Sequence, residues 1–218
     1  MFRHARYPMP SHPSLRPEQI SEILAPFGVE LSGEQIAAFS KYLDLLIRWN
    51  RVVSLTAVND AEEIVERHFG ESIFAASVIP LNGRLADVGS GAGFPGIPLK
   101  ILFSRVEALL LEPNLKKSAF LIDLCAALNL KDIKIVRSRY EDQPSNLELF
   151  DFITSRAVGD YKRMLRWARP ALKHGGGRVI LWLGEQDAIN LAKVPDWNWS
   201  LPVRIPGSRR RVLLIGQA

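Results

Sequence analysis

The chain has 218 residues, 47% hydrophobic and 23% charged, the composition of an ordinary globular protein long enough for a substantial core. It has no run of about 18 apolar residues and no apolar signal segment at its N-terminus, so we expect a cytoplasmic protein without a membrane span. The formal charge of +5 favours a polyanionic partner only weakly, because many enzymes with other substrates carry a similar charge.

Residues 1–16 mix basic residues with prolines, and we expect this arm to be disordered because it lacks the apolar residues of a core. Its basic residues are Arg3, His4, Arg6 and Arg16. Two interpretations stay open: a flexible segment that contacts RNA, or an untethered terminus without a function.

Residues 17–80 are predicted to form a helical cap. A short helix is expected over Pro17–Gly28, with glycine in its usual place after a helix C-terminus. A capping box, Ser32–Gln35, opens a longer helix that carries apolar residues at intervals of three and four and ends near Asn50. A third helix is predicted over Asp60–Val78.

From residue 81 onward strands and helices alternate, which predicts βαβ units and a mainly parallel sheet. The predicted strands are Arg84–Val88, Val106–Leu111, Ile133–Val136, Phe150–Thr154 and Arg178–Leu183. The predicted helices are Pro95–Phe103, Leu115–Leu128, Asp160–Ala168 and Glu185–Ala192. Val203–Ile215 has two apolar runs around a Pro-Gly turn and predicts an antiparallel hairpin. Residues 81–218 are therefore expected to form one doubly wound α/β domain.

A glycine-rich segment, Leu85–Gly96, joins the first of these strands to its helix. Gly89, Gly91 and Gly93 lack a Cβ, so the backbone can adopt positive φ and a ligand can approach it closely. The segment fits the dinucleotide pattern G-x-G-x-x-G. It also resembles the first motif of class I S-adenosylmethionine-dependent methyltransferases, in which an acidic residue, here Asp87, precedes G-x-G-x-G. A tight turn without a ligand is the third interpretation.

Further candidates follow the strands, because ligands of doubly wound folds bind outside the carboxyl ends of the strands. Glu112 lies roughly 20 residues beyond the glycines and can accept hydrogen bonds from both hydroxyls of a ribose. That carboxylate occurs in NAD sites and in S-adenosylmethionine sites alike. Lys116 and Lys117 begin the next helix, where cations are locally unfavourable, so either they contact phosphates or they are a solvated charge pair.

The third and fourth predicted strands are also followed by polar residues. Tyr140 and Glu141 offer an aromatic ring and a carboxylate beside an adenine. Arg156, in the sequence Ser-Arg-Ala, can form a bidentate pair with a carboxylate or a phosphate. An ordinary surface arginine is the alternative.

A metal site is not expected. The single cysteine, Cys125, excludes an intramolecular disulfide and a cysteine cluster, and it lies in an apolar helical segment where we expect a buried thiol. The four histidines have no ligand spacing.

Three segments together resemble the RsmG (GidB) family of small-subunit ribosomal RNA guanine-N7 methyltransferases. They are Asp87–Leu99 with Gly-Phe-Pro-Gly-Ile-Pro, Glu112–Leu121 with Lys-Lys-x-x-Phe-Leu, and Phe150–Ala157 with Ser-Arg-Ala. The helical N-terminal part of the family is similar at Trp49-Asn50, Leu55-Thr56, Arg67-His68 and Ser72. The resemblance covers residues 30 to 215.

The resemblance implies a class I methyltransferase fold, S-adenosylmethionine as methyl donor, and N7 of a guanine in the decoding-region loop of 16S rRNA as acceptor. It also implies that Gly89, Phe94, Tyr140 and Glu141 line the donor site, and that Arg156 contacts the donor or the RNA. The expected donor-site residues are, in full, Gly89, Gly91, Gly93, Phe94, Glu112, Tyr140, Glu141 and Arg156.

Guanine N7 carries a lone pair and no proton, so its methylation needs no base. The enzyme would act by orienting the base against the methyl group, and we predict no certain catalytic residue beyond a positioning role for Arg156. Because side chains cannot easily read the deep groove of A-form RNA, the target is expected to be unpaired. We expect a monomer that binds 16S rRNA in a 30S subunit or an assembly intermediate. The RNA-binding candidates are Lys116, Lys117, Arg209, Arg210 and Arg211.

Three positions depart from the family's usual residues: Ser54 replaces Asn, Glu71 replaces Asp, and Leu183 replaces Lys. If that lysine contacts RNA, another cation must take its place, and the candidates are Lys173, Arg178 and Arg209. A non-catalytic RNA-binding protein that retains the fold is therefore an alternative function. An NAD(P)-dependent oxidoreductase is another, although the chain shows no Tyr-Lys pair for hydride transfer.

Overall fold

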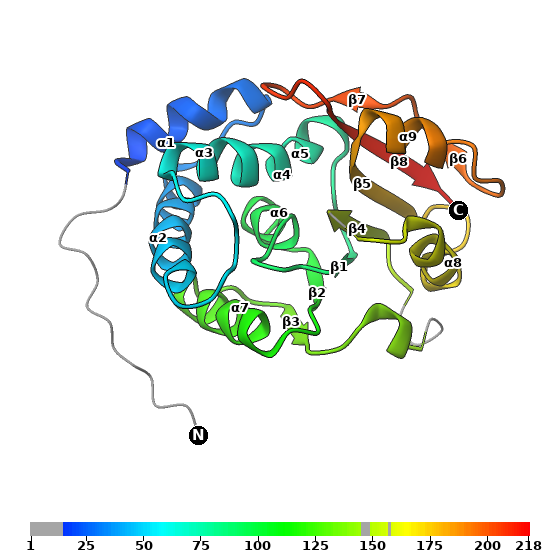
Figure 1. Ribbon diagram of the computed structural model, residues 1–218, viewed down its shortest axis with the longest axis horizontal. Helices are drawn as coiled ribbons and strands as arrows, with labels where there is room; N and C mark the ends of the chain where they lie inside the picture. Colours follow the sequence, from blue (N-terminus) through cyan, green and yellow to red (C-terminus); the bar gives the residue numbers. More distant parts are fainter. Residues whose placement is uncertain (1–14, 145–148, 157) are drawn as a thin grey trace.

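The computed structural model describes residues 15–144, 149–156 and 158–218, and it contains one sheet with helices on both faces (Figure 1). The arm expected to be disordered lies outside the described residues up to position 14. For its last two residues the expectation is wrong, because Leu15 is buried and Arg16 caps the first helix together with the side chain of Gln19. No helix in the described ranges is long and apolar enough to cross a membrane.

The sheet has the strand order β3-β2-β1-β4-β5-β8-β6, with β7 paired to β8. Strands β1 to β5 are parallel to one another, and β8 is antiparallel to β5, β6 and β7, so the mainly parallel sheet with a C-terminal hairpin is confirmed. The strands are β1 (Arg84–Val88), β2 (Glu107–Leu111), β3 (Ile133–Val136), β4 (Phe152–Arg156), β5 (Arg178–Gly184), β6 (Asn198–Trp199), β7 (Val203–Arg204) and β8 (Arg211–Gln217).

The predicted helices that follow the strands are confirmed, and they cover two faces of the sheet. They are α6 (Gly96–Leu102), α7 (Leu115–Ala127), α8 (Tyr161–Ala171) and α9 (Glu185–Leu191). A 3-10 turn after β3, η3 (Tyr140–Asp142), was not predicted. Because side chains alternate along a strand, β5 supplies Ile180 and Trp182 to the core on the side of α6 and α7, and Val179, Leu181 and Leu183 to the core on the side of α8 and α9.

The N-terminal helices pack on the α6 and α7 side. They begin with α1 (Pro17–Leu24), a 3-10 turn η1 (Ala25–Phe27) and α2 (Gly33–Asn50). The capping box before α2 is confirmed: Gln35 N–H donates to Ser32 Oγ at 3.2 Å, and Ser32 N–H donates to Gln35 Oε1 at 2.9 Å. Tyr42 Oη donates to the carbonyl of Ala92 at 2.5 Å, so α2 is anchored directly on the glycine-rich segment.

The third predicted helix is present over residues 61–78, but it is not one regular α-helix. It consists of α3 (Ala61–Ile64), a π-helical segment η2 (Val65–Gly70), α4 (Glu71–Ile73) and α5 (Ala75–Val78). A Cβ on Gly70 would lie 2.1 Å from Cε2 of Phe27, so only glycine permits this approach to η1. The wider π turn shifts the register of the residues that follow it, including Glu71.

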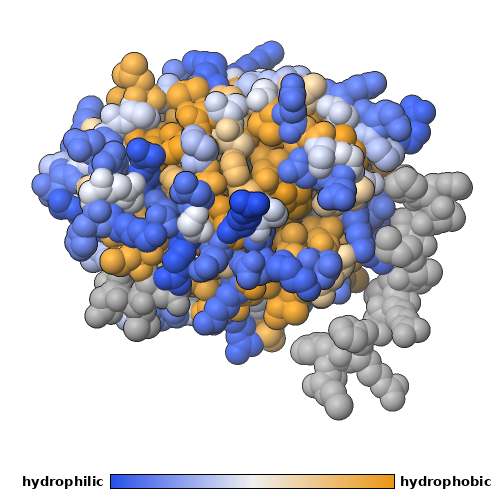
Figure 2. Space-filling view, turned by 180° about the vertical axis from the view of Figure 1, so that it is seen from behind, coloured by the Kyte–Doolittle hydropathy of each residue, from blue (hydrophilic) through white to orange (hydrophobic). Residues whose placement is uncertain are grey.

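The face opposite to that of Figure 1 presents an area of hydrophobic side chains surrounded by polar ones (Figure 2). Large hydrophobic side chains that are exposed in the described ranges come from several elements and loops, with two of them on α7: Val52, Val78, Leu115, Ile122, Leu149, Ile189 and Leu201. Single exposed apolar side chains of this kind are normal on protein surfaces.

Candidate functional site

The glycine-rich segment lies at the carboxyl end of β1, where ligands of this architecture bind. Gly89, Gly91 and Gly93 have φ values of +71°, +58° and +98°, so the predicted positive φ is confirmed at all three. A Cβ on Gly93 would lie 2.6 Å from Oη of Tyr42 and 2.8 Å from Cγ1 of Ile97. At this position both the backbone conformation and the packing require glycine.

Asp87, the acidic residue of the motif, faces inward. Its carboxylate is buried, accepts from Oγ1 of Thr154 at 2.8 Å and from N–H of Gly96 at 3.2 Å, and its burial raises the pKa to about 6. Asp87 therefore ties the first turn of α6 to β1 and β4, which fixes the shape of the glycine-rich segment from behind.

Glu112 lies against the glycine-rich segment from the end of β2. Its Oε2 accepts from N–H of Gly91 at 2.7 Å, and its Oε1 accepts from N–H of Asn114 at 2.8 Å. The residue is 5% exposed. Each carboxylate oxygen can accept a second hydrogen bond, so the group keeps the capacity for two hydroxyls of a ligand.

Lys116 and Lys117 begin α7, as predicted. The unfavourable position of two cations there is offset by Asn114, whose Oδ1 accepts from N–H of Lys116 at 2.9 Å and of Lys117 at 3.1 Å. Lys116 is exposed and Lys117 is half-buried. Within the described residues neither side chain forms an ion pair.

Tyr140 and Glu141 lie in η3, after β3. The ring of Tyr140 packs edge-on against Trp167 of α8 with centroids 5.5 Å apart, and burial raises the pKa of its hydroxyl. Glu141 pairs with Arg163 at 3.6 Å, and its Oε2 is buried without a hydrogen-bond partner among the described residues. An unsatisfied buried acceptor of this kind fits a site that receives a ligand.

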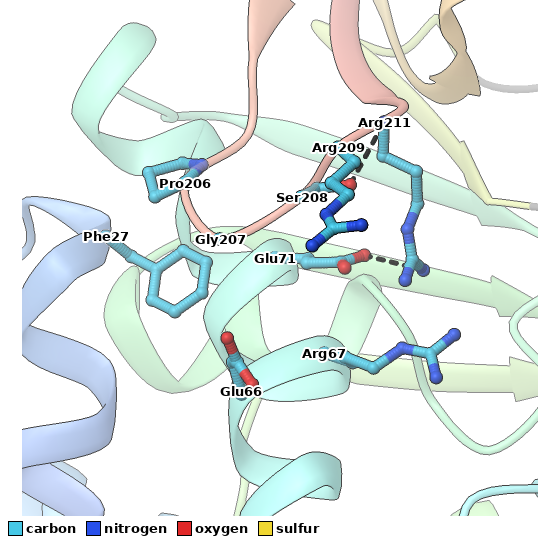
Figure 3. A pocket seen from close by; sticks show the side chains of 9 residues that line it. All are labelled: Phe27, Glu66, Arg67, Glu71, Pro206, Gly207, Ser208, Arg209 and Arg211. Carbon is cyan, nitrogen blue, oxygen red and sulfur yellow. Dashed lines mark hydrogen bonds and ion pairs between the residues drawn. The ribbon is translucent and has the colours of Figure 1, made fainter.

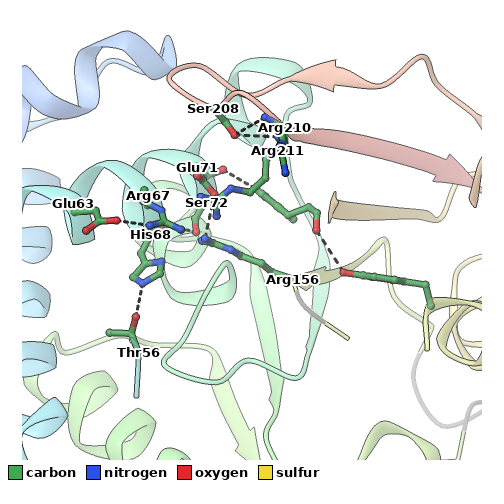
Figure 4. Close-up of polar contacts among 12 residues, drawn as sticks. Thr56, Glu63, Arg67, His68, Glu71, Ser72, Arg156, Ser208, Arg210 and Arg211 are labelled. Atoms are coloured by element: carbon green, nitrogen blue, oxygen red, sulfur yellow. Dashed lines mark hydrogen bonds and ion pairs between the residues drawn. The ribbon is translucent and has the colours of Figure 1, made fainter. Parts of the chain in front are cut away.

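Arg156, the last residue of β4, lies level with the glycine-rich segment, because β1 and β4 are in register with Val88 opposite Ser155. Its Nη2 pairs with Oε2 of Glu71 at 3.1 Å, and the two side chains are 13% and 4% exposed (Figure 4). Glu71 also pairs with Nη1 of Arg211 at 3.0 Å, and its backbone carbonyl accepts from Nε1 of Trp182 at 2.6 Å.

The surroundings of this cluster are cationic. Arg67, whose side chain pairs with Glu63, adds a third guanidinium beside Arg156 and Arg211. Burial raises the pKa of Glu71 and lowers that of Arg156 to about 10.

His68 lies between the cluster and the glycine-rich segment. Its Nε2 is 2.7 Å from Oγ1 of Thr56, and its ring stacks on Phe94 with centroids 4.8 Å apart. Burial, followed by the nearby arginines, lowers its pKa to about 3, so the imidazole is neutral at physiological pH. From the sequence, His68 was noted only as part of the Arg67-His68 pair that resembles the family, and no role was predicted for it.

A cavity of about 200 Å³ lies on the outer side of Glu71, between η2 and the turn from β7 to β8 (Figure 3). Its lining combines three cations with two carboxylates, a ring and a short turn: Arg67, Arg209, Arg211, Glu66, Glu71, Phe27, Pro206, Gly207 and Ser208. Arg209 and Arg210 are exposed, whereas Arg211 is half-buried and paired with Glu71. The three predicted RNA-binding arginines are therefore not equivalent.

The positions that depart from the family's usual residues differ in their relation to the site. Ser54 is exposed in the loop after α2, and Leu183 is 3% exposed in the core beneath α8 and α9. Two cations suggested as replacements for a lysine at position 183, Lys173 and Arg178, lie at the amino ends of β4 and β5, where Lys173 pairs with Asp151. That part of the expectation is wrong, because the candidate site is at the opposite edge of the sheet, where Arg209 lies.

No group of three His, Cys, Asp or Glu residues that could hold a metal ion occurs within the described ranges. Cys125 is buried at 8% exposure, as predicted, and burial raises the pKa of its thiol to about 12. It is an inert packing residue of α7.

Comparison with known proteins gives consistent results. Residues 35–202 match the family described as rRNA small subunit methyltransferase G. The protein named ribosomal RNA small subunit methyltransferase G from Desulfitobacterium hafniense is 45% identical over 151 residues, 68% of this chain and 63% of that protein. The protein of the same name from Roseiflexus castenholzii is 39% identical over 209 residues, 91% of this chain and 89% of that protein. The chain thus spans just under two thirds of the first relative and most of the second.

Among solved structures, a SAM-dependent methyltransferase from Aquifex aeolicus superimposes with a TM-score of 0.59 at 12% identity, over 71% of this chain and 92% of that one. At this level of identity the likeness concerns the fold. It confirms the predicted class I α/β methyltransferase architecture.

Proposed function

Since the chain belongs to the family described as rRNA small subunit methyltransferase G, we propose that it transfers a methyl group from S-adenosylmethionine to N7 of a guanine in the decoding-region loop of 16S rRNA. The substrate is the 30S subunit or an assembly intermediate, which would place the protein in the cytoplasm, and it acts as a monomer.

The donor site is formed by Gly89, Gly91, Gly93, Phe94, Glu112, Tyr140, Glu141 and Arg156, which all lie at the carboxyl edge of the sheet. The observation that carries this proposal is the hydrogen bond of 2.7 Å from Gly91 N–H to Glu112. This hydrogen bond holds a carboxylate, which can accept further hydrogen bonds, against the glycine turn. In nucleotide-binding folds such a carboxylate binds the ribose hydroxyls, while the backbone of the glycine turn contacts the rest of the ligand. The unpaired buried atoms Glu141 Oε2 and Arg156 Nη1 also fit a site that a polar ligand completes.

S-adenosylmethionine supplies a methyl group on a sulfonium, and N7 of guanine supplies the lone pair that accepts it. No proton has to be removed before transfer, which agrees with a site whose imidazole, His68, is buried and paired with Thr56. The residues of the chain act by orientation: Phe94 and His68 form a stacked wall, and Arg156 holds a reactant in place.

Contact with RNA is proposed for Lys116 and Lys117 at the start of α7 and for Arg209, Arg210 and Arg211 around the start of β8. These side chains flank the donor site on two sides of the same sheet edge. Cations at these places would contact phosphates, while the target base enters unpaired between them.

The test is transfer of labelled methyl from S-adenosylmethionine to 30S subunits that lack the modification, with free 16S rRNA in parallel. Gly89→Asp is the inactive control, because a side chain at a φ of +71° distorts the donor turn. Gly175→Asp is its matched control, since Gly175 has a φ of +76° in an exposed loop with no atom within 4 Å of an added Cβ. Transfer of label by the wild type and by Gly175→Asp, but not by Gly89→Asp, supports the proposal. Donor binding without transfer would instead identify a non-catalytic RNA-binding protein.

A further inference from the structure

Glu71 connects four elements that meet at the edge of the donor site. The residue opens α4, its carboxylate pairs with Arg156 at the end of β4 and with Arg211 at the start of β8, and its carbonyl accepts from Trp182 of β5. With 4% of its side chain exposed, it is among the most deeply buried carboxylates of the described chain.

The register of the sheet explains why these partners converge. Arg156 lies opposite Trp182 in the pairing of β4 with β5, and Arg211 lies opposite Gly184 in the pairing of β5 with β8. Residues 182 and 184 are on the same face of β5, and paired residues project to the same side of a sheet. Both arginines therefore project from the sheet toward the face that α4 covers, and Glu71 lies between them.

The charges make Glu71 the partner that fixes Arg156. Within the described residues, Arg156 and Arg211 both form their ion pair with Glu71, whereas Arg67 pairs with Glu63. A buried guanidinium without its carboxylate is costly and would move or recruit another partner. Because Oε2 of Glu71 lies 3.1 Å from Nη2 of Arg156, the position of the guanidinium depends on the cap as well as on β4.

The second terminal nitrogen of Arg156, Nη1, does not take part in the ion pair with Glu71. Nη1 is buried and has no hydrogen-bond partner among the described residues. The next positions along the site are Gly89, directly after the strand β1 that pairs with β4, and Phe94, whose ring stacks on His68. A donor group held at a fixed angle beside these residues is available to a ligand of the glycine-rich segment.

We propose that Glu71 is a positioning residue of the donor site: it holds Arg156 through Nη2, so that Nη1 is aimed at bound S-adenosylmethionine. The inference rests on the proposed donor site and adds to it a residue from the N-terminal cap that does not touch the donor. It also assigns Arg211 a different role from its neighbours Arg209 and Arg210, since Arg211 is the second cation that pairs with the buried carboxylate.

The experiment is a double-mutant cycle on the full chain, with the dissociation constant for S-adenosylmethionine measured by calorimetry in the absence of RNA. The variants are Glu71→Gln, Arg156→Lys and the two together. Glu66→Gln is the matched control, because Glu66 lines the same cavity from the preceding turn, is exposed, and forms no ion pair within the described ranges. Melting temperatures are recorded for all variants.

We expect Arg156→Lys to weaken donor binding by roughly 10-fold to 100-fold and Glu71→Gln by about 10-fold, in line with the worth of a charge-assisted hydrogen bond. The double variant should bind about as weakly as Arg156→Lys alone, because Glu71 acts through Arg156. Glu66→Gln should bind like the wild type. If Glu71→Gln does not fold, Glu71→Asn, which also removes the charge and has the size of the family's usual aspartate, replaces it in the same cycle.

Donor affinity within twofold of the wild type in Glu71→Gln, with or without a lower melting temperature, would overturn the inference and leave a purely structural ion pair. Effects that add in the double variant would overturn it as well. Methyl transfer is measured separately. If the cycle is non-additive but the protein transfers no methyl group, only the proposed reaction is rejected. If transfer is normal but the effects add, only the role of Glu71 is rejected.

Discussion

At the carboxyl edge of the sheet, the ends of β1 and β2 form a site from backbone groups, whereas the ends of β4, β5 and β8 form one from charged side chains. We call the first the glycine edge (Gly89, Gly91, Gly93 and Glu112) and the second the arginine edge (Arg156, Arg211 and Glu71). The glycine edge is fixed by positive φ angles and by N–H donors 2.7 and 2.8 Å from Glu112. The arginine edge is fixed by ion pairs that join distant parts of the chain.

This difference predicts different sensitivities. A backbone-built site tolerates no added atoms, because the chain itself must occupy one conformation. A site built from ion pairs tolerates changes of shape better than changes of charge, since a lone buried charge is the expensive state. We therefore expect the glycine edge to respond to changes in side-chain size, and the arginine edge to changes in charge.

The largest expected effect is on stability, from Gly93→Ala at the glycine edge. The added methyl group would lie 2.6 Å from Oη of Tyr42 at a φ of +98°. Overpacking and backbone strain together should lower the free energy of unfolding by roughly 3 kcal/mol. Gly175→Ala, with a φ of +76° and open space, should lose only about 1 kcal/mol. Urea unfolding measures both, and equal losses would show that packing against Tyr42 is unimportant.

The next effect is on donor affinity, from Glu112→Gln. Both carboxylate oxygens accept from backbone N–H groups, so the amide nitrogen of glutamine would face a donor. Affinity for S-adenosylmethionine should fall by roughly 10-fold to 100-fold. The matched control is Glu107→Gln at the start of β2, whose side chain is 67% exposed. Unchanged affinity in Glu112→Gln, measured by calorimetry, would remove the carboxylate from the donor site.

His68 joins the two edges, and its pKa predicts a dependence of stability on pH. Because the pKa is lowered from 6.5 to about 3 in the folded protein, the unfolded chain takes up the proton first as the pH falls below 6.5. Stability is complete above pH 6.5 and is lost below it, by about 2 kcal/mol on going to about pH 5. His68→Gln should lack this component. The free energy of unfolding is measured for both proteins at several pH values. An equal loss of stability in the two proteins over this pH interval would contradict a buried neutral imidazole.

The smallest effect concerns the salt dependence of RNA binding by the three arginines around the start of β8, of which Arg211 belongs to the arginine edge. Arg209→Gln and Arg210→Gln should each lower the slope of log affinity against log salt by about 1, because both side chains are exposed. Arg211→Gln should change the slope less, since Glu71 already neutralises Arg211. Filter binding of 16S rRNA at several salt concentrations measures the slopes. An equal change for all three arginines would mean that Arg211 is released to the RNA.

The glycine edge could be predicted from the sequence, because its signals are local. An apolar strand, three glycines and a carboxylate one strand later lie in a fixed order, and the structure brings Gly91 and Glu112 into contact. For the same reason, both ends of the strand Arg84–Val88 and the first residue of the helix that begins at Leu115 were predicted correctly.

The arginine edge could not be predicted in this way. Glu71 and Arg156 lie on elements far apart in sequence. The spacing of apolar residues at intervals of three and four indicates a helix but does not reveal the π-helical segment before Glu71. The same limit explains why three arginines in a row were expected to act together, although the pairing of β8 with β5 turns Arg211 inward. Strand β6 was missed because two residues leave no alternating pattern.

The most direct measurement of the central claim is the identity of the methylated nucleoside. Unmodified 30S subunits are incubated with the protein and S-adenosylmethionine, the 16S rRNA is digested, and the nucleosides and the modified fragment are identified by mass spectrometry. We expect 7-methylguanosine at one position, in the decoding-region loop, and its absence with Gly89→Asp. Methylation of an exocyclic amine or of a pyrimidine carbon, or no methylation by a protein that binds the donor, would contradict it.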